Sequence, residues 1–96
     1  MYEIDYSKSA EKYFKKIKDK KLLKAFKDAI DKLKPDPYIG TQKTGDLQGI
    51  YGYDVKYSGV NYEIAYKIYE ENGQLVIIIL AGTRENFYEE LKRLIK

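Results

Sequence analysis

The chain has 96 residues, of which 44% are hydrophobic and 34% charged, and its eleven tyrosines and three phenylalanines are too many for a disordered segment. This length accommodates one domain, so we expect residues 1–96 to form a single unit. Because the chain has no Cys and no His, disulfides, a thiolate nucleophile, a Ser-His-Asp triad and the usual zinc, copper and haem sites are excluded. We expect neither a metal nor a cofactor.

The net charge of +3 is unevenly distributed along the chain. Residues 1–34 hold eleven lysines against six acidic residues, whereas residues 35–96 hold seven basic against nine acidic residues. The amino terminus lacks the basic-then-apolar pattern of a signal peptide, and the longest apolar run, residues 75–81, is too short to cross a bilayer. We therefore expect a cytoplasmic protein with no membrane association.

The first third of the chain predicts a short strand followed by two helices. Residues 2–6 alternate apolar and acidic side chains, as in a half-buried strand. Ser7 is a typical N-cap for the first helix, whose apolar positions are Ala10, Phe14 and Ile17. After a turn near Asp19, a second amphipathic helix ends before two prolines and carries apolar side chains at Leu22, Leu23, Phe26, Ala29, Ile30 and Leu33.

The remainder predicts a long loop, three strands and a final helix. Residues 35–50 contain both prolines and three glycines, which is typical of a loop. In residues 51–57 and 62–68 apolar side chains recur at every second position, which places tyrosine and aliphatic side chains on one face of a strand and polar ones on the other. An Asn72-Gly73 turn leads to a β-branched run at 74–80, which indicates a central strand. The last helix, capped by Asn86 or Thr83, has Phe87, Leu91, Leu94 and Ile95 at helical spacing.

The predicted order is therefore βααβββ with a short C-terminal helix, an α+β fold. Within it, Gly45-Asp46-Leu47-Gln48-Gly49, the tyrosine-rich hairpin of residues 51–57 and 62–66, and Gly82-Thr83-Arg84 together resemble the RelE/ParE superfamily of type II toxin–antitoxin toxins. The resemblance spans the whole chain. It implies a small antiparallel sheet with the helical hairpin on one face and a concave working surface on the other.

The resemblance leaves the target of such a toxin open, since a fold does not fix a function. A RelE-like member would be a ribosome-dependent mRNA endoribonuclease, an mRNA interferase that inhibits translation. A ParE-like member would inhibit DNA gyrase, and a weakened member would act only as a partner-binding module. In each case a cognate antitoxin would neutralise the toxin by covering apolar surface near the last helix, around Phe87, Leu91 and Leu94.

Metal-free RNA cleavage needs a base for the 2′-hydroxyl, a cation near the phosphate and an acid for the leaving 5′-oxygen. Under the resemblance, Lys56 would act as base or phosphate contact, and Arg84 would stabilise the developing charge. Tyr88, which lies nearer to Arg84 than the family pattern predicts, would stack on a base or donate a proton. Lys43 and Lys67 are candidate RNA contacts, although Lys43 also fits a plain surface lysine.

Two departures weaken the nuclease prediction. Asp54 and Glu63 stand where the RelE branch carries basic residues, which should weaken phosphate binding. Glu63 could instead serve as a carboxylate general base, the most plausible one in a chain without His. A simpler interpretation is that Asp54, Lys56, Glu63 and Lys67 form cross-strand ion pairs on a solvated sheet face. The lysines of the two helices are either a solvated face or a surface for ribosomal RNA or an acidic partner.

Overall fold

The centre of the molecule is a five-stranded sheet, which the computed structural model, describing residues 1–95, shows in the strand order β1-β5-β4-β3-β2. Its strands are β1 (Glu3–Tyr6), β2 (Thr41–Gln42), β3 (Tyr51–Tyr57), β4 (Val60–Tyr69) and β5 (Leu75–Thr83). The predicted antiparallel meander is confirmed for β3, β4 and β5. The sheet as a whole is mixed, because β1 joins it parallel to β5. The strand predicted to be central, β5, is an interior strand between β1 and β4, and the middle strand of the sheet is β4.

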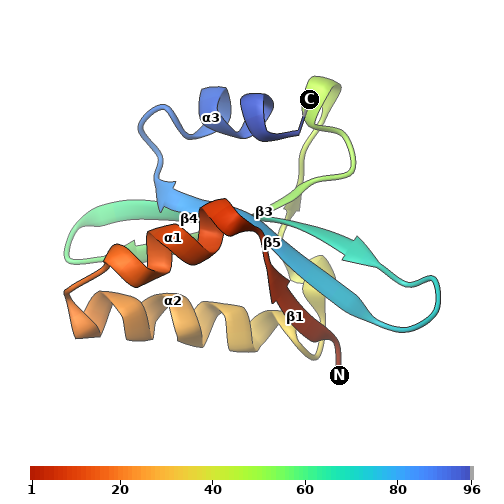
Figure 1. Cartoon of the computed structure of the whole chain (residues 1–96), viewed down its shortest axis with the longest axis horizontal. Helices are drawn as coiled ribbons and strands as arrows, with labels where there is room; N and C mark the ends of the chain where they lie inside the picture. Colours follow the sequence, from red (N-terminus) through yellow and green to blue (C-terminus); the bar gives the residue numbers. More distant parts are fainter. Residues whose placement is uncertain (96) are drawn as a thin grey trace.

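The two predicted helices of the hairpin are α1 (Lys8–Lys16) and α2 (Lys20–Leu33), and they lie together on one face of the sheet (Figure 1). Ser7 caps α1 as predicted, since its hydroxyl accepts a hydrogen bond from the Ala10 N–H. Asp19 caps α2 through the N–H groups of Lys21 and Leu22. The last helix, α3 (Phe87–Leu94), packs against the other face.

Strand alternation gives the molecule a separate core on each face of the sheet. On β4, Ile64 and Tyr66 turn toward the hairpin and pack with Phe26 of α2. Ala65 turns the other way, toward α3. The second core is smaller and consists of Leu47, Ile50, Ala65, Leu80, Phe87 and Leu91.

The connections explain how the strands reach this arrangement. Ser58 and Gly59 have φ values of 52° and 77°, the geometry of a two-residue turn that matches strand twist. The predicted loop at 35–50 is more ordered than expected, with 3-10 turns η1 (Pro37–Ile39) and η2 (Gly45–Leu47) on either side of β2. The buried Tyr66 hydroxyl donates to the Pro37 carbonyl at 2.6 Å, which ties this segment to the sheet.

Candidate functional site

The polar centre of the second sheet face is Glu63, whose side chain is only 1% exposed. On β4 it lies opposite Asp54 of β3 and Gly82 of β5. Because an unpaired buried carboxylate is costly, its neighbours must balance the charge. The cations of Lys43 and Arg84 do so, and the Tyr88 hydroxyl adds a hydrogen bond. With Glu63 they form what we call the Glu63 cluster: Lys43, Glu63, Arg84 and Tyr88.

The cluster is a closed network around the carboxylate. Lys43 Nζ lies 2.8 Å from Glu63 Oε2, but off the direction of a good hydrogen bond, so this contact is mainly ionic. The Tyr88 hydroxyl donates to Glu63 Oε1 at 3.0 Å and accepts from Lys43 Nζ at 2.8 Å. The ammonium also lies 4.6 Å from the centre of the Tyr88 ring, in a cation–π contact.

Arg84 forms the exposed side of the cluster, with 47% of its side chain accessible. Its Nη2 donates to the Tyr88 hydroxyl at 3.3 Å, and its Nε lies 3.6 Å from Glu63 Oε1. Its Nη1 lies 3.8 Å from the Asp54 carboxylate. These distances are long for charge-assisted hydrogen bonds, so Arg84 is the member most easily diverted to another anion.

Each side chain is delivered by a different element. Lys43 follows β2, and its backbone N–H donates to the Ile50 carbonyl at 2.8 Å, which fixes the start of the loop. Arg84 follows β5 directly, and its backbone N–H donates a hydrogen bond to the Asn61 carbonyl. Tyr88 is the second residue of α3, a helix held in place by the burial of Phe87 and Leu91.

Both basic groups of the cluster stay protonated. Burial lowers the pKa of Lys43, but its contacts with Glu63 and Tyr88 outweigh this effect, so the pKa is raised overall. The hydrogen bond to Tyr88 and the nearby carboxylates raise the pKa of Arg84. The cluster therefore offers two cations and a phenol above a buried carboxylate, with the two positive charges balanced by Glu63 and Asp54.

The other two predicted lysines lie outside this network. Lys56 is exposed on β3 opposite Asn61, which places it diagonally from Glu63 on the same face, about 7–8 Å away between Cα atoms. Lys67 lies further along β4, opposite Ile77. Within residues 1–95, neither lysine forms an ion pair.

Two interpretations drawn from the sequence are wrong. The alternating charges of β3 and β4 do not pair across the strands, because Glu63 is buried and pairs with Lys43 and Arg84, and Asp54 pairs with Arg84. Lys43 is not a plain surface lysine, since its side chain is only 16% exposed. The spacing of residues along the chain gave no indication that Lys43 would pair with Glu63. The one hint was Gly52, because a glycine inside a strand often marks the close approach of another group.

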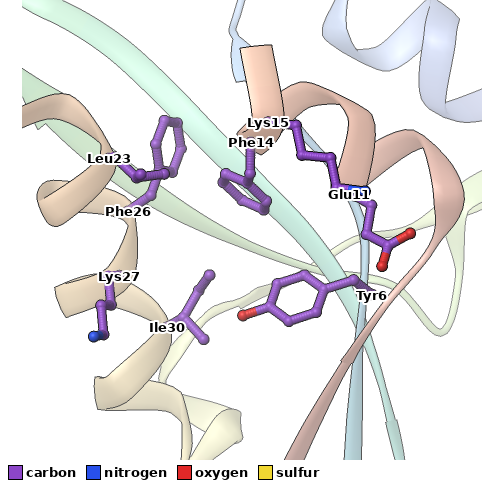
Figure 2. Close-up of a pocket in the computed structure, with 8 residues that line it drawn as sticks. All are labelled: Tyr6, Glu11, Phe14, Lys15, Leu23, Phe26, Lys27 and Ile30. Carbon is purple, nitrogen blue, oxygen red and sulfur yellow. The ribbon is translucent and has the colours of Figure 1, made fainter. Parts of the chain in front are cut away.

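The apolar surface expected beside α3 is also largely absent. Phe87 and Leu91 are buried in the second core, and only Leu94 remains exposed, at 42%. An apolar groove lies instead on the hairpin side, between β1, α1 and α2 (Figure 2). It encloses about 440 Å³, and Tyr6 and Leu23 on its walls are each 39% exposed.

Residues 1–95 bring together no group of three or more acidic side chains that could hold a metal ion. No helix in this part of the chain combines the length and the apolar character needed to span a membrane.

Comparison with known proteins identifies the fold. The E. coli RelE toxin, solved in the free state as a double arginine-to-alanine mutant, superposes with a TM-score of 0.72 at 22% identity, covering 98% of each chain. A chain of the intact E. coli RelBE toxin–antitoxin complex superposes with a TM-score of 0.70 at 22% identity, and the match covers 86% of this chain and 96% of the chain in the complex. A chain of the RelBE2 toxin–antitoxin complex of Mycobacterium tuberculosis superposes with a TM-score of 0.67 at 21% identity, and the match covers 86% of this chain and 98% of the chain in the complex.

Comparison with curated proteins gives no match. Residues 4–92 match the model of the ParE-like toxin of the type II bacterial toxin–antitoxin system. This match covers nearly the entire chain, and the RelE structures share its fold. The chain therefore belongs to the ParE-like toxin family of type II toxin–antitoxin systems.

Proposed function

We propose that this toxin is a RelE-like, ribosome-dependent mRNA endoribonuclease that acts in the cytoplasm and is neutralised by a cognate antitoxin. The observation that supports this most directly is the Tyr88 hydroxyl, which contacts two cations and a buried carboxylate at once. A phenol in such a setting can pass a proton while adjacent cations stabilise negative charge.

The reaction in this proposal is attack of a ribose 2′-hydroxyl on the adjacent phosphate. Arg84 turns toward a non-bridging phosphate oxygen, and Lys56 contacts the same backbone from β3. Once Arg84 has left the Tyr88 oxygen, that oxygen can accept the 2′-proton while the Tyr88 proton passes to Glu63 Oε1 along the existing hydrogen bond. The leaving 5′-oxygen takes its proton from solvent, and the RNA is left with a 2′,3′-cyclic phosphate.

This scheme gives Glu63 a different position from the one the sequence predicted. With 1% of its side chain exposed, Glu63 is too deeply covered to meet a 2′-hydroxyl directly. In this scheme the proton therefore reaches Glu63 through the phenol of Tyr88, whose hydroxyl donates a hydrogen bond to Oε1.

The test is induced expression followed by mapping of transcript ends. We expect growth arrest, with new 5′ ends only in transcripts that are being translated. Tyr88→Phe and Arg84→Ala should each abolish cleavage. Two variants are matched controls, because Tyr69→Phe and Arg93→Ala alter exposed side chains outside the cluster. If Tyr88→Phe and Arg84→Ala cleave as the parent does, the site assignment is wrong.

Inhibition of DNA gyrase is the second candidate, favoured by the charge balance of the cluster. Asp54 and Glu63 already neutralise Arg84 and Lys43, and phosphate affinity depends on cations left free to replace counterions. Under this alternative, induced cells would show DNA damage signalling and altered plasmid supercoiling with intact transcripts. Overexpression without a growth defect would instead indicate an inactive member that only binds partners.

For the antitoxin, we propose that an acidic amphipathic segment docks in the groove shown in Figure 2. The groove is lined by apolar side chains that include Phe14, Phe26 and Ile30, and its charged lining residues are two lysines, Lys15 and Lys27, and one acid, Glu11. A helical or extended segment with an apolar stripe and acidic flanks complements such a surface.

Co-purification with the antitoxin encoded by a neighbouring gene tests this docking site. The double variant Lys15→Glu/Lys27→Glu should lose most of the bound antitoxin. Lys12→Glu/Lys32→Glu is the control, since it makes the same two charge reversals on exposed residues of α1 and α2 outside the groove. If the groove variant and the control variant lose equal amounts of bound antitoxin, only the overall charge matters, and docking in the groove is contradicted.

A further inference from the structure

Gly52, the second residue of β3, faces the carboxylate of Glu63. A Cβ atom at this position would collide with Glu63 Oε2 and would lie 2.7 Å from Lys43 Cε and 2.9 Å from Lys43 Nζ. Cβ atoms do not approach other atoms this closely, so the ends of the Glu63 and Lys43 side chains would have to shift to admit any larger residue. Gly52 lies within a regular strand and is absent from the positive-φ residues. Space, not backbone conformation, therefore requires glycine here.

The backbone around Gly52 also directs Lys43 into this space. Gly52 pairs with Thr41 and Tyr51 with Gln42 across the β2–β3 ladder, and the Lys43 N–H is held by the Ile50 carbonyl. The lysine side chain therefore passes over the glycine to reach Glu63. With a side chain at position 52, it would have to turn elsewhere.

Lys43 in turn determines where the Tyr88 hydroxyl can lie. The ammonium contacts the phenol oxygen at 2.8 Å and also lies against the ring. Glu63 accepts the phenol proton from the opposite side. Two short contacts from separate elements fix both the position of the hydroxyl and the direction of its proton.

We propose that Gly52 and Lys43 are positioning residues: the space at Gly52 admits the Lys43–Glu63 ion pair, and that pair holds the Tyr88 hydroxyl beside Arg84. This inference rests on the proposed function for its catalytic consequence, but the geometric claim can be tested without activity. A displacement of about 1 Å in a reacting group can slow a reaction by about 100-fold.

The test uses Gly52→Ala and Lys43→Met, with Gly82→Ala as the control. A Cβ at Gly82 would meet only Tyr13 at 3.9 Å, an ordinary contact. With tyrosine rings labelled for NMR, and the Tyr88 signal identified by its loss in Tyr88→Phe, we expect that signal to move in Gly52→Ala and Lys43→Met. It should stay in place in Gly82→Ala.

The functional arm measures cleavage on purified translating ribosomes. Gly52→Ala and Lys43→Met should lower the single-turnover rate by about 100-fold while the affinity for the ribosome stays within about twofold of the parent. If the parent cleaves nothing, the proposed function fails, and the NMR result still decides the positioning claim. An unmoved Tyr88 signal in folded Lys43→Met overturns that claim, even if Gly52→Ala does not fold.

Discussion

A buried carboxylate is tolerated in a small domain only when its charge is balanced, and Glu63 depends on Lys43 for much of that balance. Lys43→Met leaves the carboxylate with only Tyr88 and the longer contact to Arg84. We expect a loss of about 3 kcal/mol in the free energy of unfolding, measured by urea denaturation. The double variant Lys43→Met/Glu63→Leu should recover to within about 1 kcal/mol of the parent, because no buried charge remains.

The matched control for this pair is Lys24→Met on α2. Lys24 pairs with Asp28 at 3.0 Å, but both side chains are more than half exposed, and such pairs contribute less than about 1 kcal/mol. If the double variant is as unstable as Lys43→Met alone, the cost does not arise from an unpaired carboxylate, and the assigned role of Lys43 in stability is wrong.

A second carboxylate, Glu70, links stability to pH. Hydrogen bonds from Tyr2 and Tyr38 lower the pKa of Glu70 below its ordinary value of 4.5, and the bond to Glu70 is the main cause that raises the pKa of Tyr2 to about 12. A lowered folded-state pKa stabilises the protein above pH 4.5, and this stabilisation is lost as the pH falls through the folded-state value.

Glu70→Gln tests this linkage by urea denaturation between about pH 7 and about pH 3. The parent should be more stable than Glu70→Gln at neutral pH, and the difference should shrink as the pH falls below 4.5. Glu71→Gln, on an exposed neighbouring residue, is the control for the loss of one surface charge. If the stability difference between the parent and Glu70→Gln is independent of pH, the linkage is contradicted.

At the scale of elements, Ser7 joins three of them. Its hydroxyl accepts from the Ala10 N–H at 3.1 Å, which caps α1, and donates to the Ile79 carbonyl of β5 at 2.5 Å. Ser7→Ala should cost about 2 kcal/mol, because it removes the cap and leaves a carbonyl without its partner. Ser9→Ala, within α1, should instead be neutral or stabilising by up to about 0.5 kcal/mol, since alanine favours helix. Equal effects of the two substitutions on thermal unfolding would exclude the capping role.

Local patterns predicted the elements but not their distant contacts. The Ser7 cap, the apolar stripe of α2 and the alternation of β3 depend on neighbours within a few residues, and all were visible in the sequence. The pairing of β1 with β5 joins residues about 70 positions apart, and no periodicity encodes it. The same limit explains the site: all four residues of the Glu63 cluster were named individually from the sequence, but the pairing of Lys43 with Glu63 was not, because it depends on how the loop after β2 passes over Gly52.

At the scale of the whole molecule, the two faces of the sheet are covered very unequally. On one face, α2 buries Phe26, Ala29, Ile30 and Leu33, whereas on the other face α3 buries only Phe87 and Leu91. Apolar burial is the main stabilising contribution, so α3 should detach at a lower free energy than that required for global unfolding. Detachment would also carry Tyr88 away from Glu63.

Native-state amide hydrogen exchange measures this difference directly. Amides of α2 should exchange only through global unfolding, with a strong dependence on urea, whereas those of α3 should exchange through a local opening that depends little on urea. Leu91→Ala should speed exchange in α3 far more than in α2, and Phe26→Ala, which removes about 3–5 kcal/mol from the larger core, should speed both. If α3 and α2 exchange at the same free energy in the parent, the molecule opens only as one unit, and Tyr88 leaves Glu63 only when the whole domain unfolds.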